Sequence, residues 1–159
     1  MNTRRFLALL CALLLTLSLA ACGGGSGNKT ADPGTLADDM LAALSPQGET
    51  IEVTGDVAAN YYQIGDEVKD YRIYLSTMYI AEEVAVFRLA DAKDVDAAKK
   101  LCETRIQDLK DSFEGYLPDE YATVEENAVV LAEGDVVALI IGTKEGVAAA
   151  EEVFNKALG

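Results

Sequence analysis

Few side chains in this sequence are of a type that carries out chemistry. The 159 residues include no histidine, which excludes Ser-His and Cys-His nucleophile pairs and any His-ligated zinc site. No glycine-rich loop is followed by Lys and Ser/Thr at P-loop spacing. We therefore expect no catalytic residues, no metal site and no cofactor, and we predict that the protein is not an enzyme.

Adjacent acidic residues come nearest to a catalytic dyad or a cation site. Four pairs consist of the same acid twice: Asp38–Asp39, Glu82–Glu83, Glu125–Glu126 and Glu151–Glu152. Neighbours on a strand or helix point in different directions, so a working dyad would need residues from separate elements. We interpret the pairs as solvated charge. Carboxylates that converged in a cleft would instead indicate an acid-dependent envelope hydrolase.

A second chemical feature is Cys22, which separates an apolar run from a glycine-rich stretch. Arg4 and Arg5 precede 16 largely apolar residues, 6–21. That length suits the apolar region of a signal peptide and is short of the ~20 residues that cross a bilayer. We predict a signal peptide over residues 1–21. A plain secreted protein and an uncleaved anchor are the alternatives.

The stretch Leu19-Ala20-Ala21-Cys22 resembles the lipobox of bacterial lipoproteins. This resemblance implies that the Cys22 sulfur receives a diacylglyceryl group and that cleavage leaves Cys22 as the first residue. Two acyl chains anchor a protein stably, whereas one does so only marginally. Residues 22–34 form the lipidated cysteine and a Gly/Ser-type tether of about 20 Å. We expect the protein at the outer face of the cytoplasmic membrane.

Cys102 is then the remaining cysteine, because Cys11 lies in the signal peptide and Cys22 is lipidated. No intramolecular disulfide can form, and the domain depends on its core. Cys102 lies in the apolar stripe of a predicted helix. We interpret it as a small buried residue, with a reactive thiol as the alternative.

The charge balance limits the partners. The chain carries 13 Lys and Arg against 27 Asp and Glu, a net charge of −14. Such a protein is repelled by nucleic-acid backbones, so we expect no nucleic-acid partner. The same acidity is able to attract cations or a basic partner.

The residue pattern predicts a single α+β extracytoplasmic domain over residues 35–159. N-terminal helices are followed by a ββαββα order, giving a four-stranded, mainly antiparallel sheet with helices packed on one face. The strand order is left open. The expected helices are 35–44, 57–64, 94–115 and 144–158, and the expected strands are 71–77, 82–90 and two runs flanking residues 133–135, of which 136–141 is central.

An aromatic and acidic segment follows the longest predicted helix. It contains Phe113, Tyr116, Leu117 and Tyr121 within the sequence FEGYLPDEY. Tyrosine supplies a large contact area with a polar tip, so these four residues are the candidate surface for a partner. In the alternative interpretation the segment ends a helix, and Tyr116 and Leu117 fold back on the core.

Three stretches, EEVAVFRLAD, SFEGYLPDEY and ENAVVLAEGDVVALII, resemble a family of domains of unknown function, number 4358. The resemblance extends over roughly residues 36–158. Members look like small lipoproteins and secreted proteins of Gram-positive bacteria. It implies a shared extracytoplasmic domain, without catalytic or binding residues that carry over.

These observations favour a membrane-anchored surface lipoprotein that acts as a non-catalytic binding or adaptor module for an envelope protein partner. The alternative is a receptor domain for a small ligand or a cation. A concave pocket with converging polar groups favours the receptor, and an exposed flat apolar patch favours the adaptor.

Overall fold

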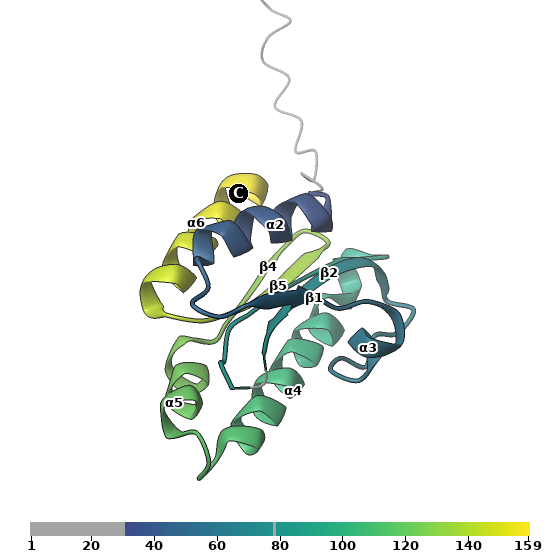
Figure 1. Ribbon diagram of the computed structural model, residues 1–159. Coiled ribbons are helices and arrows are strands. Elements are labelled where there is room, and N and C mark those ends of the chain that lie inside the picture. The colour runs from purple at the N-terminus through teal and green to yellow at the C-terminus, as the bar shows by residue number, and fades with distance from the viewer. Residues whose placement is uncertain (1–30, 78) are drawn as a thin grey trace, which may run out of the picture.

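The computed structural model describes residues 31–77 and 79–159. The predicted signal peptide, Cys22 and the tether up to residue 30 lie outside the described residues. The described chain folds around one antiparallel sheet with the strand order β1-β2-β3-β5-β4 (Figure 1). The strands are β1 (Thr50–Glu52), β2 (Val68–Ser76), β3 (Glu83–Leu89), β4 (Val129–Glu133) and β5 (Val136–Ile141). The α+β class is confirmed, but the sheet has five strands instead of four.

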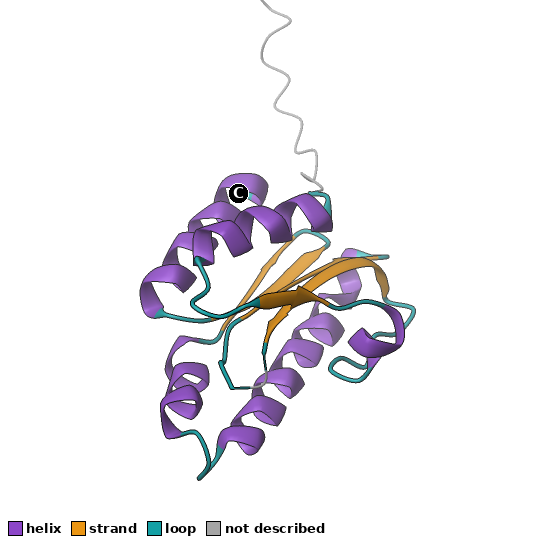
Figure 2. Ribbon diagram, in the orientation of Figure 1, coloured by secondary structure: helices purple, strands orange, loops and turns teal. Residues whose placement is uncertain are grey.

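Helices cover both faces of this sheet, and the expectation of helices on one face is wrong. Figure 2 shows α2 and α6 on one side of the strands and α4 and α5 on the other. The helices are α2 (Pro33–Leu44), α3 (Gly55–Ala59), α4 (Val95–Phe113), α5 (Pro118–Asn127) and α6 (Lys144–Leu158), and a short 3-10 turn, η1 (Ala92–Asp94), leads into α4.

Strand β5 shows why both faces need a cover. All six of its residues are buried. Val137, Leu139 and Ile141 belong to the core beneath α4, and the alternate residues belong to the core beneath α2 and α6. A strand buried on both faces has a nearly continuous apolar sequence. That run correctly predicted an interior strand, and it also carried the signal for a second helical layer.

The first helix begins at Pro33, two residues before the expected start. The Asp32 carboxylate accepts hydrogen bonds from the Thr35 backbone N–H (2.9 Å) and hydroxyl (3.2 Å), so Asp32 is the N-cap. Pro33 occupies the first turn, where its missing N–H costs no hydrogen bond. The cap therefore precedes the proline instead of following it.

The helices α2 and α6 approach each other closely near Gly146. A Cβ atom at Gly146 would lie 2.4 Å from the Leu44 carbonyl oxygen, so glycine is required for this contact. The N–H of Gly146 also receives a cap from the Thr143 hydroxyl at 3.2 Å. The last helix occupies the predicted residues, and its start is set by both features.

Helix α5 is not among the elements expected from the sequence, in which FEGYLPDEY follows or ends the preceding helix. In the structure Pro118 is the first residue of the helix, and Asp119 and Glu120 occupy its first turn. Proline at this position and acids near the positive end of the helix dipole are both favourable. Gly115, at φ +69°, makes the turn between α4 and α5.

The N-terminal part of the domain differs in two further details. Helix α3 covers residues 55–59 rather than the expected 57–64. Strand β1 was missed because three residues are too short to show alternation. It pairs with β2 in the register Ile51 opposite Leu75.

None of the helices in the described part of the chain is long and apolar enough to span a membrane.

Candidate functional site

The four residues predicted as a partner surface differ in how far they are exposed. Phe113 is buried at the end of α4, with 6% of its surface exposed. Leu117 and Tyr121 are partly buried and pack against the same core. Tyr116 is 68% exposed and stands alone among the four. The segment therefore forms the corner between α4 and α5, and Tyr116 is the one of the four candidate residues that is exposed there.

Cys102 lies in the middle of α4 and is fully buried. Burial, and next the negative charge of Glu83, raise the pKa of the thiol far above its ordinary value. Because the thiolate is the reactive form, we expect this cysteine not to react in the folded protein. Its interpretation as a small core residue is confirmed.

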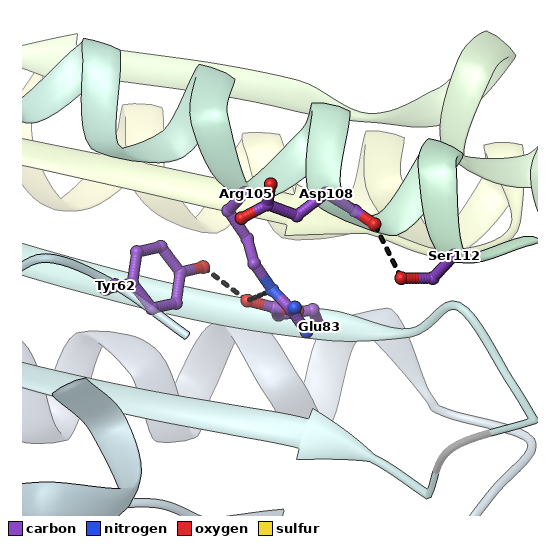
Figure 3. A network of polar contacts seen from close by, with 5 residues as sticks. All are labelled: Tyr62, Glu83, Arg105, Asp108 and Ser112. Carbon is purple, nitrogen blue, oxygen red and sulfur yellow. Dashed lines mark hydrogen bonds and ion pairs between the residues drawn. The ribbon is translucent and has the colours of Figure 1, made fainter. Parts of the chain in front are cut away.

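Glu83, the first residue of β3, has 3% of its surface exposed and stands at the centre of a buried polar network. Arg105 of α4 donates to its carboxylate from Nε at 3.0 Å and from Nη2 at 2.9 Å. The Tyr62 hydroxyl, from the segment after α3, donates to the same carboxylate. Figure 3 shows how Arg105 reaches down from α4 toward Glu83 and Tyr62. Three separate elements are joined at this carboxylate.

Within the network, the charge of Glu83 is balanced by the charge of Arg105. Burial alone would lower the pKa of Arg105, but the charge and hydrogen bonds of Glu83, together with Tyr62 and Tyr61, raise the pKa above its ordinary value. Burial, and next the charge of Glu83, raise the pKa of Tyr62 well above its ordinary value, so its hydroxyl stays protonated. The Tyr62 ring packs edge-on against Phe87 at a centroid distance of 5.1 Å, which holds the hydroxyl in place.

The neighbouring Glu82 binds a different segment of the chain. Its carboxylate accepts hydrogen bonds from the backbone N–H groups of Gln47 (2.9 Å) and Gly48 (3.1 Å) in the connection between α2 and β1. Glu82 and Glu83 are both buried, and the expectation that this pair is solvated is wrong. Each carboxylate instead ties a different segment to the start of β3.

Two hollows flank Tyr61 on the face of the domain that carries α4. The first, of about 430 Å³, lies between the β1–β2 edge and the second half of α4, and Ile51, Leu109 and Arg105 are among the residues that line it. The second, of about 370 Å³, lies between the segment after α3 and the first half of α4, and its lining includes the polar side chains of Asn60, Gln63, Lys100, Thr104 and Asp108.

Tyr61 lines both hollows, is 40% exposed and places its ring 4.8 Å from the Arg105 guanidinium carbon. We call Tyr61 and the two hollows the α4 groove. The helix residues along it run from Ala97 to Phe113, which at ~1.5 Å per residue is about 24 Å. A cation stacked on an aromatic ring stabilises both side chains in one arrangement. The middle of the groove is therefore preorganised.

The groove offers apolar walls and hydrogen-bond donors. Both oxygens of Glu83 are occupied, whereas Nη1 of Arg105 has no hydrogen-bond partner among the described residues. The Ser112 hydroxyl donates to the Asp108 carbonyl oxygen at 2.7 Å and keeps acceptor capacity. Residues 31–77 and 79–159 contain no group of three or more Cys, Asp or Glu placed to hold a metal ion. The geometry suits a ligand with apolar groups and carbonyl oxygens.

Sequence reasoning interpreted Glu83 as solvated charge and did not connect it with Tyr62 or Arg105. The available signal was an acid placed directly before an apolar strand, where an unpaired charge would be costly. Its partner was not identifiable, because Arg105 is 22 residues away on another element.

A family model described as a domain of unknown function, DUF4358, matches residues 44–142. The matched range runs from the last residue of α2 to the residue after β5, and it includes Tyr62, Glu83 and Arg105. No curated protein and no solved structure matches the chain.

Proposed function

The chain belongs to the DUF4358 family, and we propose that this member is a lipid-anchored, non-catalytic binding module of the cell envelope. The lipobox-like stretch that ends at Cys22 supports the anchor. A diacylglyceryl group on Cys22 and a tether of about 20 Å hold the domain beside the outer face of the cytoplasmic membrane.

One observation carries the binding role, namely the α4 groove. Its two hollows, of about 430 and 370 Å³, adjoin at an exposed aromatic residue that a buried ion pair holds in place. Tyrosine combines a large contact area with a polar tip and is enriched at interfaces, so the position of Tyr61 between the two hollows supports a binding role. The proposed partner is a protein of the envelope.

The direction of the groove supports this role. The described chain starts at Ala31, next to the N-terminus of α2, and α2 and α6 form the layer opposite to α4 (Figure 1). The groove therefore lies on the face away from the point where the tether joins the domain. A partner in the envelope reaches this face without passing between the domain and the membrane.

Crosslinking on intact cells tests the proposal. The anchored protein is crosslinked to its neighbours, recovered and analysed by mass spectrometry, with Tyr61→Ala and Tyr116→Ala as matched variants. Both variants remove an exposed tyrosine, one from the groove and one from the α4–α5 corner. We expect one dominant partner that is lost in Tyr61→Ala and kept in Tyr116→Ala. Loss in Tyr116→Ala alone would move the binding surface to the corner.

A receptor for a small ligand is the second candidate, and the size of the larger hollow favours it. Pockets for small ligands commonly measure ~300–1,000 Å³, and this hollow measures about 430 Å³. In that case a compound that fills it raises the melting temperature of the full chain, and Leu109→Trp, which narrows it, abolishes the rise.

A further inference from the structure

We propose that the outer edge of β1 accepts an extended polypeptide segment as a sixth strand of the sheet, with one apolar side chain of that segment entering the larger hollow. This inference rests on the proposed function, and it names the chemistry of the partner. The partner segment alternates apolar and basic residues.

The register of β1 shows which of its backbone groups point outward. The Val53 N–H donates to the Ile73 carbonyl oxygen at 3.0 Å, which makes this a hydrogen-bonded pair. Hydrogen-bonded pairs alternate along an antiparallel ladder, so the pair of Ile51 and Leu75 is also hydrogen-bonded. The N–H and C=O groups of Thr50 and Glu52 therefore point away from β2.

No further strand of the described chain pairs with this outer edge. An outward row of alternating N–H and C=O groups is matched in register by another polypeptide backbone, which is the basis of recognition by strand addition. Thr50 and Glu52 together offer two donors and two acceptors. A glycan or a lipid does not present this alternation.

The other edge strand, β4, is less suited to a partner. Its four apolar residues, Val129 to Ala132, are all partly buried and pack against the two cores. Ile51 of β1, in contrast, is 51% exposed. The edge at β1 is thus the one where an added strand would cover exposed apolar surface.

The hollow lies on the side where the added side chain would project. Side chains of directly paired residues share a face of the sheet. Ile51 and its partner Leu75 both line the hollow of about 430 Å³, together with Leu109 and Phe113 of α4. A residue placed opposite Ile51 on an added strand points to the same face and extends the apolar contact into this hollow.

The negative charge of the molecule favours basic side chains at the remaining positions of the partner segment. The chain has a net charge of −14, and Glu49, directly before β1, is exposed. The alternate positions of an added strand point to the other face of the sheet, the face of Glu52 and of Asp38 on α2, where Arg72 is the neighbouring cation. Basic residues at the alternate, outward positions of the partner complement this surface, and acidic residues are repelled.

The test uses the full chain in detergent micelles and a fluorescein-labelled decapeptide of alternating Lys and Val, with empty micelles as the blank. Fluorescence anisotropy measures the binding. Thr50→Pro removes an outward N–H that takes no part in the β1–β2 ladder, and proline is tolerated at such edge positions. Thr50→Ala, which keeps the N–H, is the matched control. A second probe is the same peptide with alternate backbone nitrogens methylated, which blocks strand pairing without any change in the protein.

We expect the Lys-Val peptide to bind the unmodified chain and Thr50→Ala equally, and to bind Thr50→Pro at least tenfold more weakly. The methylated peptide and a Glu-Val peptide should also bind at least tenfold more weakly. The inference is overturned if the Lys-Val peptide does not bind, or if methylation leaves its affinity unchanged. In either case a partner crosslinked through Tyr61 on cells would still support the binding module, so the two proposals fail separately.

Discussion

Arg105 and Glu83 connect the longest described helix to the middle strand of the sheet through a buried ion pair. Nε and Nη2 of Arg105 lie 3.0 and 2.9 Å from Oε2 of Glu83, and the side chains are 11% and 3% exposed. The same guanidinium supports the ring of Tyr61 in the α4 groove. The pair thus links the stability of the domain to the shape of its proposed binding surface.

Removing one member of this pair should be costly. We predict that Glu83→Ala lowers the free energy of unfolding by about 3–5 kcal/mol, because it leaves the Arg105 charge buried without a partner. Urea denaturation measures the change. Glu125→Ala is the matched control, since Glu125 pairs with Lys110 at 3.1 Å with its side chain 53% exposed, and exposed pairs contribute about 0–1 kcal/mol. Similar losses in the two variants would contradict the buried network.

Tyr62→Phe measures how much the Tyr62 hydroxyl contributes to the free energy of unfolding. The variant keeps the ring contact with Phe87 and removes a hydrogen bond to a charged group, so we expect a loss of about 1.5–3 kcal/mol near neutral pH. The folded-state pKa of Tyr62 is raised, first by burial and then by Glu83. Its contribution is therefore complete below the unfolded pKa of about 10 and falls as the pH rises above that value.

The difference between Tyr62→Phe and the unmodified protein should consequently shrink between pH 10 and 11, by up to about 1.4 kcal/mol per pH unit. Urea denaturation of both proteins at pH 8, 9, 10 and 11 measures this trend. A difference that stays constant across the series would show that Tyr62 titrates at an ordinary pKa.

Cys102 should not react in the folded protein. Burial raises the pKa of its thiol, and no part of its surface is exposed, so a maleimide reagent at pH 7 finds neither thiolate nor access. We predict that peptide mapping detects labelled Cys102 only after denaturation. Labelling at the same rate before and after denaturation would show that the core beneath α4 is open.

The membrane anchor is tested at Cys22. We expect Cys22→Ala to release the protein from membranes or to leave it unprocessed, because the sulfur that carries the diacylglyceryl group is missing. Cell fractionation measures the first result and the mass of the protein measures the second. Cys102→Ala, which removes a different thiol, should leave the localisation unchanged. A Cys22→Ala protein that is processed and still bound to membranes would contradict the lipoprotein proposal.

The elements with a strong periodic signal were predictable. The apolar run 136–141 indicated an interior strand, and the helix over 144–158 was identified with its correct ends. Strand β1 was not predictable, because three residues are too few to show an alternation of apolar and polar side chains. The three residues are extended because they pair with β2, and this pairing cannot be read from the segment itself.

The candidate site was less predictable than the fold. Sequence reasoning chose Tyr116 and its neighbours, because aromatic residues at a break suggest a surface. The structure instead places Tyr61 between two hollows and pairs Glu83 with Arg105, a contact between residues 22 positions apart. The position of Glu83 directly before an apolar strand was a local signal for burial, but its partner depends on the packing of a distant segment, which a single sequence does not reveal.

Site-specific photo-crosslinking tests the central claim, that the α4 groove is the binding surface. A photoreactive phenylalanine analogue replaces Tyr61, Tyr116 or Glu152 in the anchored protein on intact cells. Glu152 is exposed on α6, on the face opposite to α4. The account predicts a discrete adduct from position 61 and none above background from position 152. Discrete adducts from position 116 or 152, with none from position 61, would contradict it.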